Sequence, residues 1–162
     1  MKTICVLLGL ALPMVVRAQV TAPGAEPPFQ AAAGAFFALS VADIQASAKW
    51  YSEKLGLKVV MEVPKKDKVA VTVLEGRGLI VELIQHDEAL PLSKAAPAVT
   101  GDLFVHGVFK AGVIVEDFER TVATLRARNV EIAYGPFPAR ERQRANVIIK
   151  DNSGNLIQFF GK

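Results

Sequence analysis

The chain has 162 residues and a formal net charge of +3, from 19 basic and 16 acidic side chains. This length suits one ordinary domain with a real hydrophobic core. The near balance of charge gives no reason to expect nucleic acid or an acidic membrane as a partner. A single cysteine, Cys5, leaves no internal disulfide to stabilise the fold.

The first 18 residues predict a signal peptide. Lys2 gives a basic start, and residues 4–16 form an apolar run that is too short to cross a bilayer of about 30 Å. Small or apolar residues stand at −3 and −1 of a cleavage point before Gln19. Cleavage would remove Cys5 and lower the formal charge to +1, because Lys2 and Arg17 leave with the peptide. We therefore expect an exported protein, periplasmic or secreted, without membrane contact after cleavage. Residues 19–34, rich in Ala, Pro and Gly, predict a flexible lead.

Residues 35–86 predict the first of two similar modules. A strand-like run precedes Asp43, whose carboxylate can cap a helix. Gly56 supplies the left-handed residue that ends this helix. Three more strand-like segments follow, at residues 57–63, 68–75 and 78–85, with Pro64 in the first turn between them. One face of the predicted helix is apolar through four residues: Ile44, Ala48, Tyr51 and Leu55.

Residues 104–162 repeat the pattern after a polar connector at residues 87–103. Asp117 lies 74 residues after Asp43 and is the second predicted cap. Asn129 takes the place of Gly56, as the next best residue for left-handed backbone. Strand-like segments at 108–116, 130–135, 142–151 and 155–160 complete the module. The apolar stripe recurs at the same offset, as Phe118, Val122 and Leu125. Chance similarity of two αβ units is disfavoured, because cap, stripe, helix stop and strand order all match.

The repeat predicts an α+β domain of two βαβββ modules. Each module has an open sheet with a helix on one face, so its other face must be covered or used. We expect the two sheets to form a curved mixed sheet around a cleft, with the ligand site between the modules.

Two motifs add a resemblance to this prediction. "LSVADIQASAKWYSEKLGL" resembles the opening of a vicinal oxygen chelate module, the fold of glyoxalase I, bleomycin-resistance proteins and extradiol dioxygenases. "KDNSGNLIQFF" is similar to the closing strand of that family, usually Asp-Pro-Asp-Gly-Asn followed by an apolar residue and Glu. The resemblance covers residues 35–160. It implies the fold more strongly than a reaction, because this fold hosts many activities.

The resemblance also implies where a metal would bind. The family's metal ligands come from the first and last strands of each module, and the matching positions here are Phe36, Glu82, Lys110 and Gln158. One carboxylate and one amide are a poor donor set for Zn²⁺, Fe²⁺ or Ni²⁺, and a protonated lysine repels cations. We therefore expect no metal cofactor. We hypothesise instead that Lys110 pairs with Glu82, with Gln158 hydrogen-bonded to either one.

Two alternatives to that ion pair stay open. A register slip of one residue would turn Lys110 toward solvent. A metal could also be held by Glu82 together with His86 and His106, although both histidines stand at the ends of predicted strands.

Other residues have weaker functional signals. Arg140, Arg142 and Arg144 alternate, which predicts one side of an extended segment. On the outside they would be a solvated edge, the favoured interpretation; on the inside, Arg144 is the one best placed to reach the cleft and hold an anion. Trp50 and Tyr51 are predicted to pack in the core.

The leading hypothesis for function is an exported, bleomycin-resistance-like protein that binds a small molecule without a metal. One alternative is a metal-dependent, glyoxalase-like lyase, isomerase or dioxygenase, in which Glu82 and Lys110 would be the catalytic candidates. The other is a structural partner whose cleft is filled by Phe36 and Phe160. The resemblance also allows a homodimer in which modules of two chains pair. The candidate ligand-site residues are Phe36, Ser40, Glu82, Lys110, Arg144 and Gln158.

Overall fold

The computed structural model describes residues 36–101 and 106–162. The predicted signal peptide and flexible lead therefore lie outside the described residues. The described residues all belong to one compact unit. None of the helices in the described ranges is long and apolar enough to cross a membrane.

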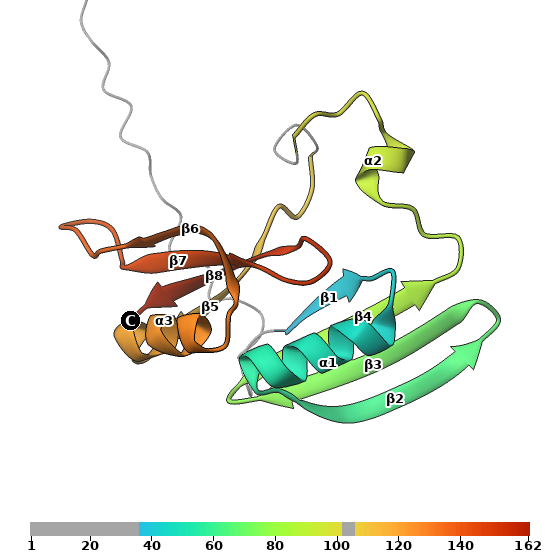
Figure 1. The fold of residues 1–162 in the computed structure, drawn as a ribbon, viewed down its shortest axis with the longest axis horizontal. Helices are drawn as coiled ribbons and strands as arrows, with labels where there is room; N and C mark the ends of the chain where they lie inside the picture. Colours follow the sequence, from blue (N-terminus) through green and yellow to red (C-terminus); the bar gives the residue numbers. More distant parts are fainter. Residues whose placement is uncertain (1–35, 102–105) are drawn as a thin grey trace, which may run out of the picture. The chain divides into compact units, whose positions relative to one another are not determined.

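The first module has the predicted βαβββ order (Figure 1). Its strands form one mixed sheet in the order β1-β4-β3-β2, in which β1 runs parallel to β4 and the other pairs are antiparallel. The helix α1 lies across β3 and β4. The elements are β1 (Phe36–Ser40), α1 (Ile44–Trp50), the π-helical turn η1 (Tyr51–Leu55), β2 (Lys58–Lys66), β3 (Val69–Gly76) and β4 (Leu79–His86).

Both predicted ends of the first helix are confirmed. Asp43 Oδ1 accepts a hydrogen bond of 2.9 Å from the Ala46 backbone N–H, and Gly56 has the left-handed φ of 74° that stops the helix. The predicted end of β2 before Pro64 was wrong. The strand continues to Lys66, because Pro64 lies in an irregular stretch of an edge strand, where a proline costs little pairing.

The second module repeats this arrangement as a sheet in the order β5-β8-β7-β6 with α3 against β8. Asp117 Oδ1 caps α3 by accepting from the Arg120 backbone N–H, and Asn129 is left-handed with φ 53°, both as predicted. The connector contains a short helix, α2 (Leu92–Ala95), that the sequence did not predict. The elements are β5 (Ala111–Val115), α3 (Phe118–Ala127), β6 (Glu131–Phe137), β7 (Asn146–Lys150) and β8 (Leu156–Gly161).

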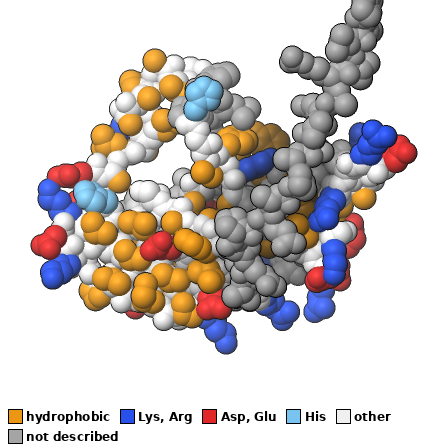
Figure 2. Space-filling model, turned by 180° about the vertical axis from the view of Figure 1, so that it is seen from behind, with side chains coloured by type: hydrophobic (Ala, Val, Ile, Leu, Met, Phe, Trp, Pro, Cys, Tyr) orange, Lys and Arg blue, Asp and Glu red, His pale blue; other side chains and the backbone are white. Residues whose placement is uncertain are grey.

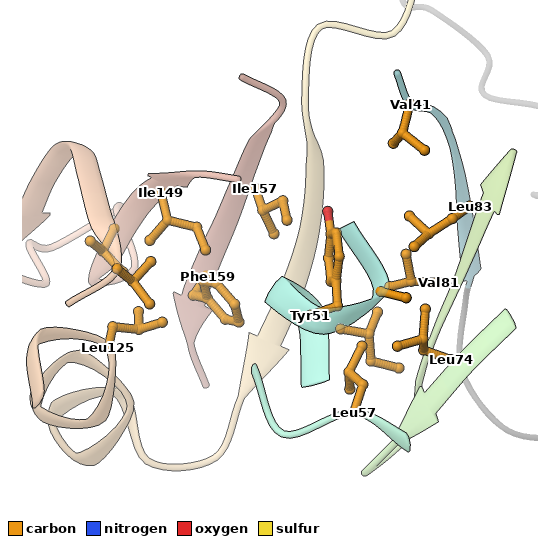
Figure 3. Close-up of a cluster of buried hydrophobic side chains, with 14 of the residues drawn as sticks. Val41, Tyr51, Leu57, Leu74, Val81, Leu83, Leu125, Ile149, Ile157 and Phe159 are labelled. Carbon is orange, nitrogen blue, oxygen red and sulfur yellow. The ribbon is translucent and has the colours of Figure 1, made fainter. Parts of the chain in front are cut away.

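The predicted fold class is confirmed, but the two sheets are not continuous. They are separate four-stranded sheets, and β1 and β5 are edge strands without a second strand partner among the described residues. The modules are joined instead through their helix-facing sides, which share one hydrophobic core. Figure 3 shows Tyr51 between Val81 and Leu83 of the first module and Ile157 and Phe159 of the second. The apolar stripes of the two helices and sheets therefore fill a common interior.

A buried hydrogen bond crosses this core. Tyr51 is fully buried, and its hydroxyl donates to Asp151 Oδ2 at 2.8 Å. Asp151 also accepts hydrogen bonds from the backbone N–H groups of Ser153 and Asn155 and from the Asn155 side chain, at 2.8 to 2.9 Å. Burial, together with the negative charge of Asp151, raises the pKa of the Tyr51 phenol, so that it stays protonated and donates.

Further polar contacts join the same two parts of the chain. Asn152 Nδ2 donates to Ser47 Oγ on α1 at 3.2 Å. At the ends of the helices, Lys54 Nζ donates to the Arg128 carbonyl at 2.6 Å, and Arg128 Nη1 donates to the Lys54 carbonyl at 3.0 Å. The Asp-Asn-Ser-Gly-Asn turn, singled out in the sequence as a family motif, thus docks the second module onto the helix of the first.

Replacing Tyr51 by Phe tests this contact. We expect Tyr51→Phe to lower the free energy of unfolding by about 1–2 kcal/mol, because Asp151 loses one of its buried donors. The measurement is guanidinium unfolding of the full chain. Tyr134→Phe is the matched control, since Tyr134 is 56% exposed and should leave the free energy unchanged. Equal stability of Tyr51→Phe and the unsubstituted chain would contradict a stabilising role for the hydrogen bond.

Candidate functional site

The face of the β1–β4 sheet that points away from α1 carries the site candidates of the first module. Leu79, Val81 and Leu83 of β4 are buried toward the helix, whereas the alternate residues are only half-buried. Because side chains alternate along a strand, these residues and their cross-strand partners share the opposite face, here called the open face. By register its members are Phe36, Ala38, Ser40, Lys58, Met61, Val63, Lys66, Val69, Val71, Val73, Glu75, Ile80, Glu82, Ile84 and His86.

Glu82 lies at the centre of this face among apolar side chains. Its cross-strand partners are Ala38 on β1 and Val73 on β3. Its neighbours two positions away along β4 are Ile80 and Ile84. Figure 2 shows hydrophobic side chains gathered over this sheet on the side away from α1, with an acidic group among them.

The open face is accessible to a ligand. Phe36 is 64% exposed, Met61 47% and Val63 46%. Contiguous apolar surface of this kind on a soluble protein commonly marks a binding site. The open face therefore has the character of a binding surface, with one carboxylate inside it.

Among residues 36–101 and 106–162, Glu82 has no charge partner. Glu75, the other acidic residue of the open face, is opposed across the strands by Lys58. Glu82 takes part in none of the five ion pairs found among the described residues. A carboxylate in apolar surroundings without a partner costs free energy when it is covered. A residue that lowers the stability of the fold in this way is expected at a functional position.

The predicted equivalence of Glu82 and Gln158 is confirmed by the register. Ala38 pairs with Glu82 and Gly112 pairs with Gln158, and positions 38 and 112 differ by the same 74 residues as the two helix caps. Gln158, unlike Glu82, is buried and satisfied. Its Nε2 donates to Asn146 Oδ1 at 3.0 Å.

Lys110 does not neutralise Glu82 within this chain. It precedes β5 and is exposed, and its ammonium lies 6.0 Å from the centre of the Phe109 ring. No ion pair between Lys110 and Glu82 occurs in the described part of the chain. The reason is architectural, because Glu82 lies in the first sheet, Lys110 directly precedes the second, and the edges of these two sheets are not paired.

Arg140, Arg142 and Arg144 are exposed, in agreement with the favoured interpretation of a solvated position. Their predicted alternation along an extended segment was wrong. Arg140 and Gln143 are bonded to each other in a tight turn between β6 and β7, through backbone hydrogen bonds of 2.8 and 3.1 Å. Alternation therefore does not apply. Arg140, Arg142 and Arg144 instead line a groove of about 520 Å³ at the start of α3. The structure thus brings Phe36, Ser40 and Glu82 onto one face, while Lys110, Arg144 and Gln158 lie in the second module.

The donor set around Glu82 does not fit a divalent metal. Within residues 36–101 and 106–162, no three His, Cys, Asp or Glu residues are grouped so that they could hold an ion. The alternative set of Glu82, His86 and His106 is therefore not assembled there. His86 Nδ1 already accepts a hydrogen bond of 3.0 Å from the Glu88 backbone N–H. One carboxylate bordered by Ala38, Val73 and isoleucines cannot supply the ligands that Zn²⁺, Fe²⁺ or Ni²⁺ require.

Apart from Phe36, the apolar members of the open face were not among the residues predicted from the sequence to form the site. Their signal is the run "GLIVELIQ", in which apolar residues stand on both sides of Glu82 at successive positions. When a strand carries apolar side chains on both faces, each face is expected to be covered by another part of the protein, by a ligand or by a partner. One face meets α1, and the other is open for a ligand or partner.

Replacing Glu82 by Val tests whether the carboxylate is held at a cost in stability. We expect Glu82→Val to raise the free energy of unfolding by about 1 kcal/mol, because a β-branched residue packs against Ala38 and Val73. Guanidinium unfolding measures the change. The control is Glu62→Val, on β2 of the same sheet but paired with Thr72 of the buried side, which should stay within about 0.5 kcal/mol of the unsubstituted chain. A loss of stability in Glu82→Val would mean that the carboxylate has a structural partner.

Solved structures share this architecture at low sequence identity. A glyoxylase/bleomycin resistance protein/dioxygenase domain from Frankia sp. EAN1pec is 16% identical with a TM-score of 0.62, covering 82% of this chain and 92% of its own. TnmS3, an antibiotic binding protein from Streptomyces sp. CB03234, is 17% identical with a TM-score of 0.55, covering 78% and 92%. The trypanothione-dependent glyoxalase I of Leishmania major is 21% identical with a TM-score of 0.55, covering 78% and 84%. At these identities the likeness shows the fold alone.

Sequence comparison gives the family. Among curated protein sequences, none matches the chain significantly. The family pattern that matches residues 35–159, most of the chain and both modules, is that of the Glyoxalase/Bleomycin resistance protein/Dioxygenase superfamily. The resemblance in the helix-opening and closing-strand motifs is thereby confirmed, and the chain belongs to this superfamily.

Proposed function

We propose that this protein is an exported small-molecule-binding member of the superfamily, which holds its ligand against the open face without a divalent metal. The observation that carries the proposal is the half-buried Glu82 carboxylate, alone among Ala38, Val73, Ile80 and Ile84. An accessible apolar face with a single polar anchor is what a binding site for a small organic molecule requires.

The structural relatives include both a binder and an enzyme. TnmS3 is described as an antibiotic binding protein, and the Leishmania protein as a glyoxalase I. The residues around Glu82 favour the likeness to the binding protein. A lyase or dioxygenase that depends on a metal needs several metal ligands at one point.

Three of the candidate residues have a role in this proposal. Phe36 gives an apolar wall, Ser40 a hydroxyl, and Glu82 fixes the orientation of the ligand. Lys110, Arg144 and Gln158 lie in the second module and not on the open face, so the proposal gives them no contact with the ligand. A homodimer is part of the proposal, since a second copy could cover the open face.

Metal addition tests the binding mode. We expect the purified full chain to contain no stoichiometric metal and to show no Glu82-dependent thermal shift with Ni²⁺, Zn²⁺, Fe²⁺ or Mn²⁺, since a bound ion would stabilise by mass action. Elemental analysis and thermal unfolding of the unsubstituted chain and Glu82→Ala make the comparison. Stoichiometric metal that is lost in Glu82→Ala would overturn the metal-free proposal and favour the enzyme.

Export has its own test. Production of the full chain in a bacterial host should yield a mature protein that begins at Gln19, because residues 16–18 fit a signal peptidase site. Intact mass and N-terminal sequencing of the periplasmic and culture fractions identify the cut. Recovery of the uncleaved chain in the cytoplasm alone would contradict export.

A further inference from the structure

The charge pattern of the open face narrows the chemical class of its ligand. Resting on the proposed function, we infer that the ligand is an apolar molecule with one positively charged nitrogen, for which Glu82 is the counter-charge. The nitrogen belongs over the centre of the sheet, and the apolar body covers the surrounding side chains.

Nothing on the sheet around Glu82 can satisfy its carboxylate. The four nearest positions on the face, two across the strands and two along β4, are occupied by Ala38, Val73, Ile80 and Ile84. Ala38 is small, which leaves room beside the carboxylate on the β1 side.

The second module shows what a satisfied version of this position looks like. Gln158 occupies the equivalent place, and Asn146 reaches it with a hydrogen bond of 3.0 Å. By register, Asn146 corresponds to Val71 of the first module, because Ile148 and Val73 are the direct partners of Gln158 and Glu82. Val71 has no polar atom to offer. The first module therefore leaves the partner of Glu82 to be supplied from outside.

Desolvation makes this a selective arrangement. A neutral apolar molecule that covers the face removes water from Glu82 and offers no hydrogen-bond donor in its place, which costs free energy. An anion adds repulsion. A protonated amine replaces the lost water with a charge-assisted hydrogen bond in surroundings from which water is excluded. The same carboxylate thus attracts cations and discriminates against neutral and anionic molecules of the same shape.

A second polar group marks one end of the face. His86 lies four residues beyond Glu82 on β4, about 13 Å away along an extended strand. Because its Nδ1 accepts the Glu88 N–H, Nε2 carries the proton of the neutral ring and is the donor left for a ligand. A ligand with an acceptor oxygen at that distance from its cationic nitrogen could bind His86 Nε2 with the oxygen and Glu82 with the nitrogen.

Three naphthalene probes of similar shape test the inference: 2-naphthylmethylamine, 2-naphthalenemethanol and 2-naphthoate. Calorimetric titration of the full chain near neutral pH should give the amine an affinity at least about fivefold higher than the alcohol, and the naphthoate the lowest. The isosteric Glu82→Gln should abolish this difference. The preference of the unsubstituted chain should shrink as salt is raised, because the interaction is between charges.

Two further variants separate the outcomes. Glu62→Gln removes a carboxylate from the other face of the same sheet and should keep the preference for the amine. Lys110→Ala should also keep it. A preference that appears only in Lys110→Ala would show that Lys110 already neutralises Glu82, and this would overturn the inference.

The failure of this inference differs from the failure of the proposed function. Equal affinities for the three probes, in both the unsubstituted chain and Glu82→Gln, would falsify the inference while leaving a small-molecule site on the open face. Absence of binding by every probe up to about 5 mM, which corresponds to a binding free energy weaker than about 3 kcal/mol, would overturn both.

Discussion

The hydrogen bond from the Tyr51 phenol to the Asp151 carboxylate is the contact on which the arrangement of the two modules depends. It joins residues 100 positions apart inside a shared hydrophobic core. A buried carboxylate is tolerable only when its oxygens are well supplied with donors. Asp151 therefore needs the turn that contains Ser153 and Asn155 as well as the helix that contains Tyr51. Because the modules meet through their helix-facing sides, the open face of the first sheet stays available for a ligand.

The two modules have diverged at one equivalent position. In the second, Gln158 is held by Asn146 within its own sheet, so that the polar pair contributes to the fold. In the first, Glu82 has no such neighbour, and the valines and isoleucines around it favour packing and oppose the charge. One module thus satisfies its central polar group, and the other does not. This difference indicates that the two modules have different roles. The second sheet stabilises the fold, and the first presents a site.

The sequence predicted those features that depend on neighbours along the chain. Asp43 and Asp117 as caps, Gly56 and Asn129 as helix stops, and the apolar stripes all follow from contacts within a few residues. The match of Glu82 to Gln158 also succeeded, because both modules keep the same spacing from first strand to cap: Ala38, the partner of Glu82, precedes Asp43 by as many residues as Gly112, the partner of Gln158, precedes Asp117.

Features that depend on contacts between distant segments were harder to predict. The extent of β2 past Pro64 depends on its being an edge strand, which the local sequence does not reveal. Arg140, Arg142 and Arg144 lie in a tight turn, where alternate residues do not point to the same side as they do in a strand. The predicted Lys110–Glu82 pair required two sheets to meet, whereas the buried Tyr51–Asp151 contact joins the modules on the other side of each sheet. Pairing between modules is set by the core as a whole, so counting along one strand could not find it.

The kind of chemistry open to this face follows from how many polar groups converge on one point. Metal-assisted catalysis needs several donors within about 2–2.5 Å of an ion, which in this fold would come from both sheets. Acid–base catalysis needs a second titratable group within hydrogen-bond reach of the substrate. Glu82 has neither in the described part of its own sheet, since His86 is about 13 Å away along β4. A single carboxylate in an apolar setting can still orient and select a charged ligand, because that task needs only one partner of opposite sign.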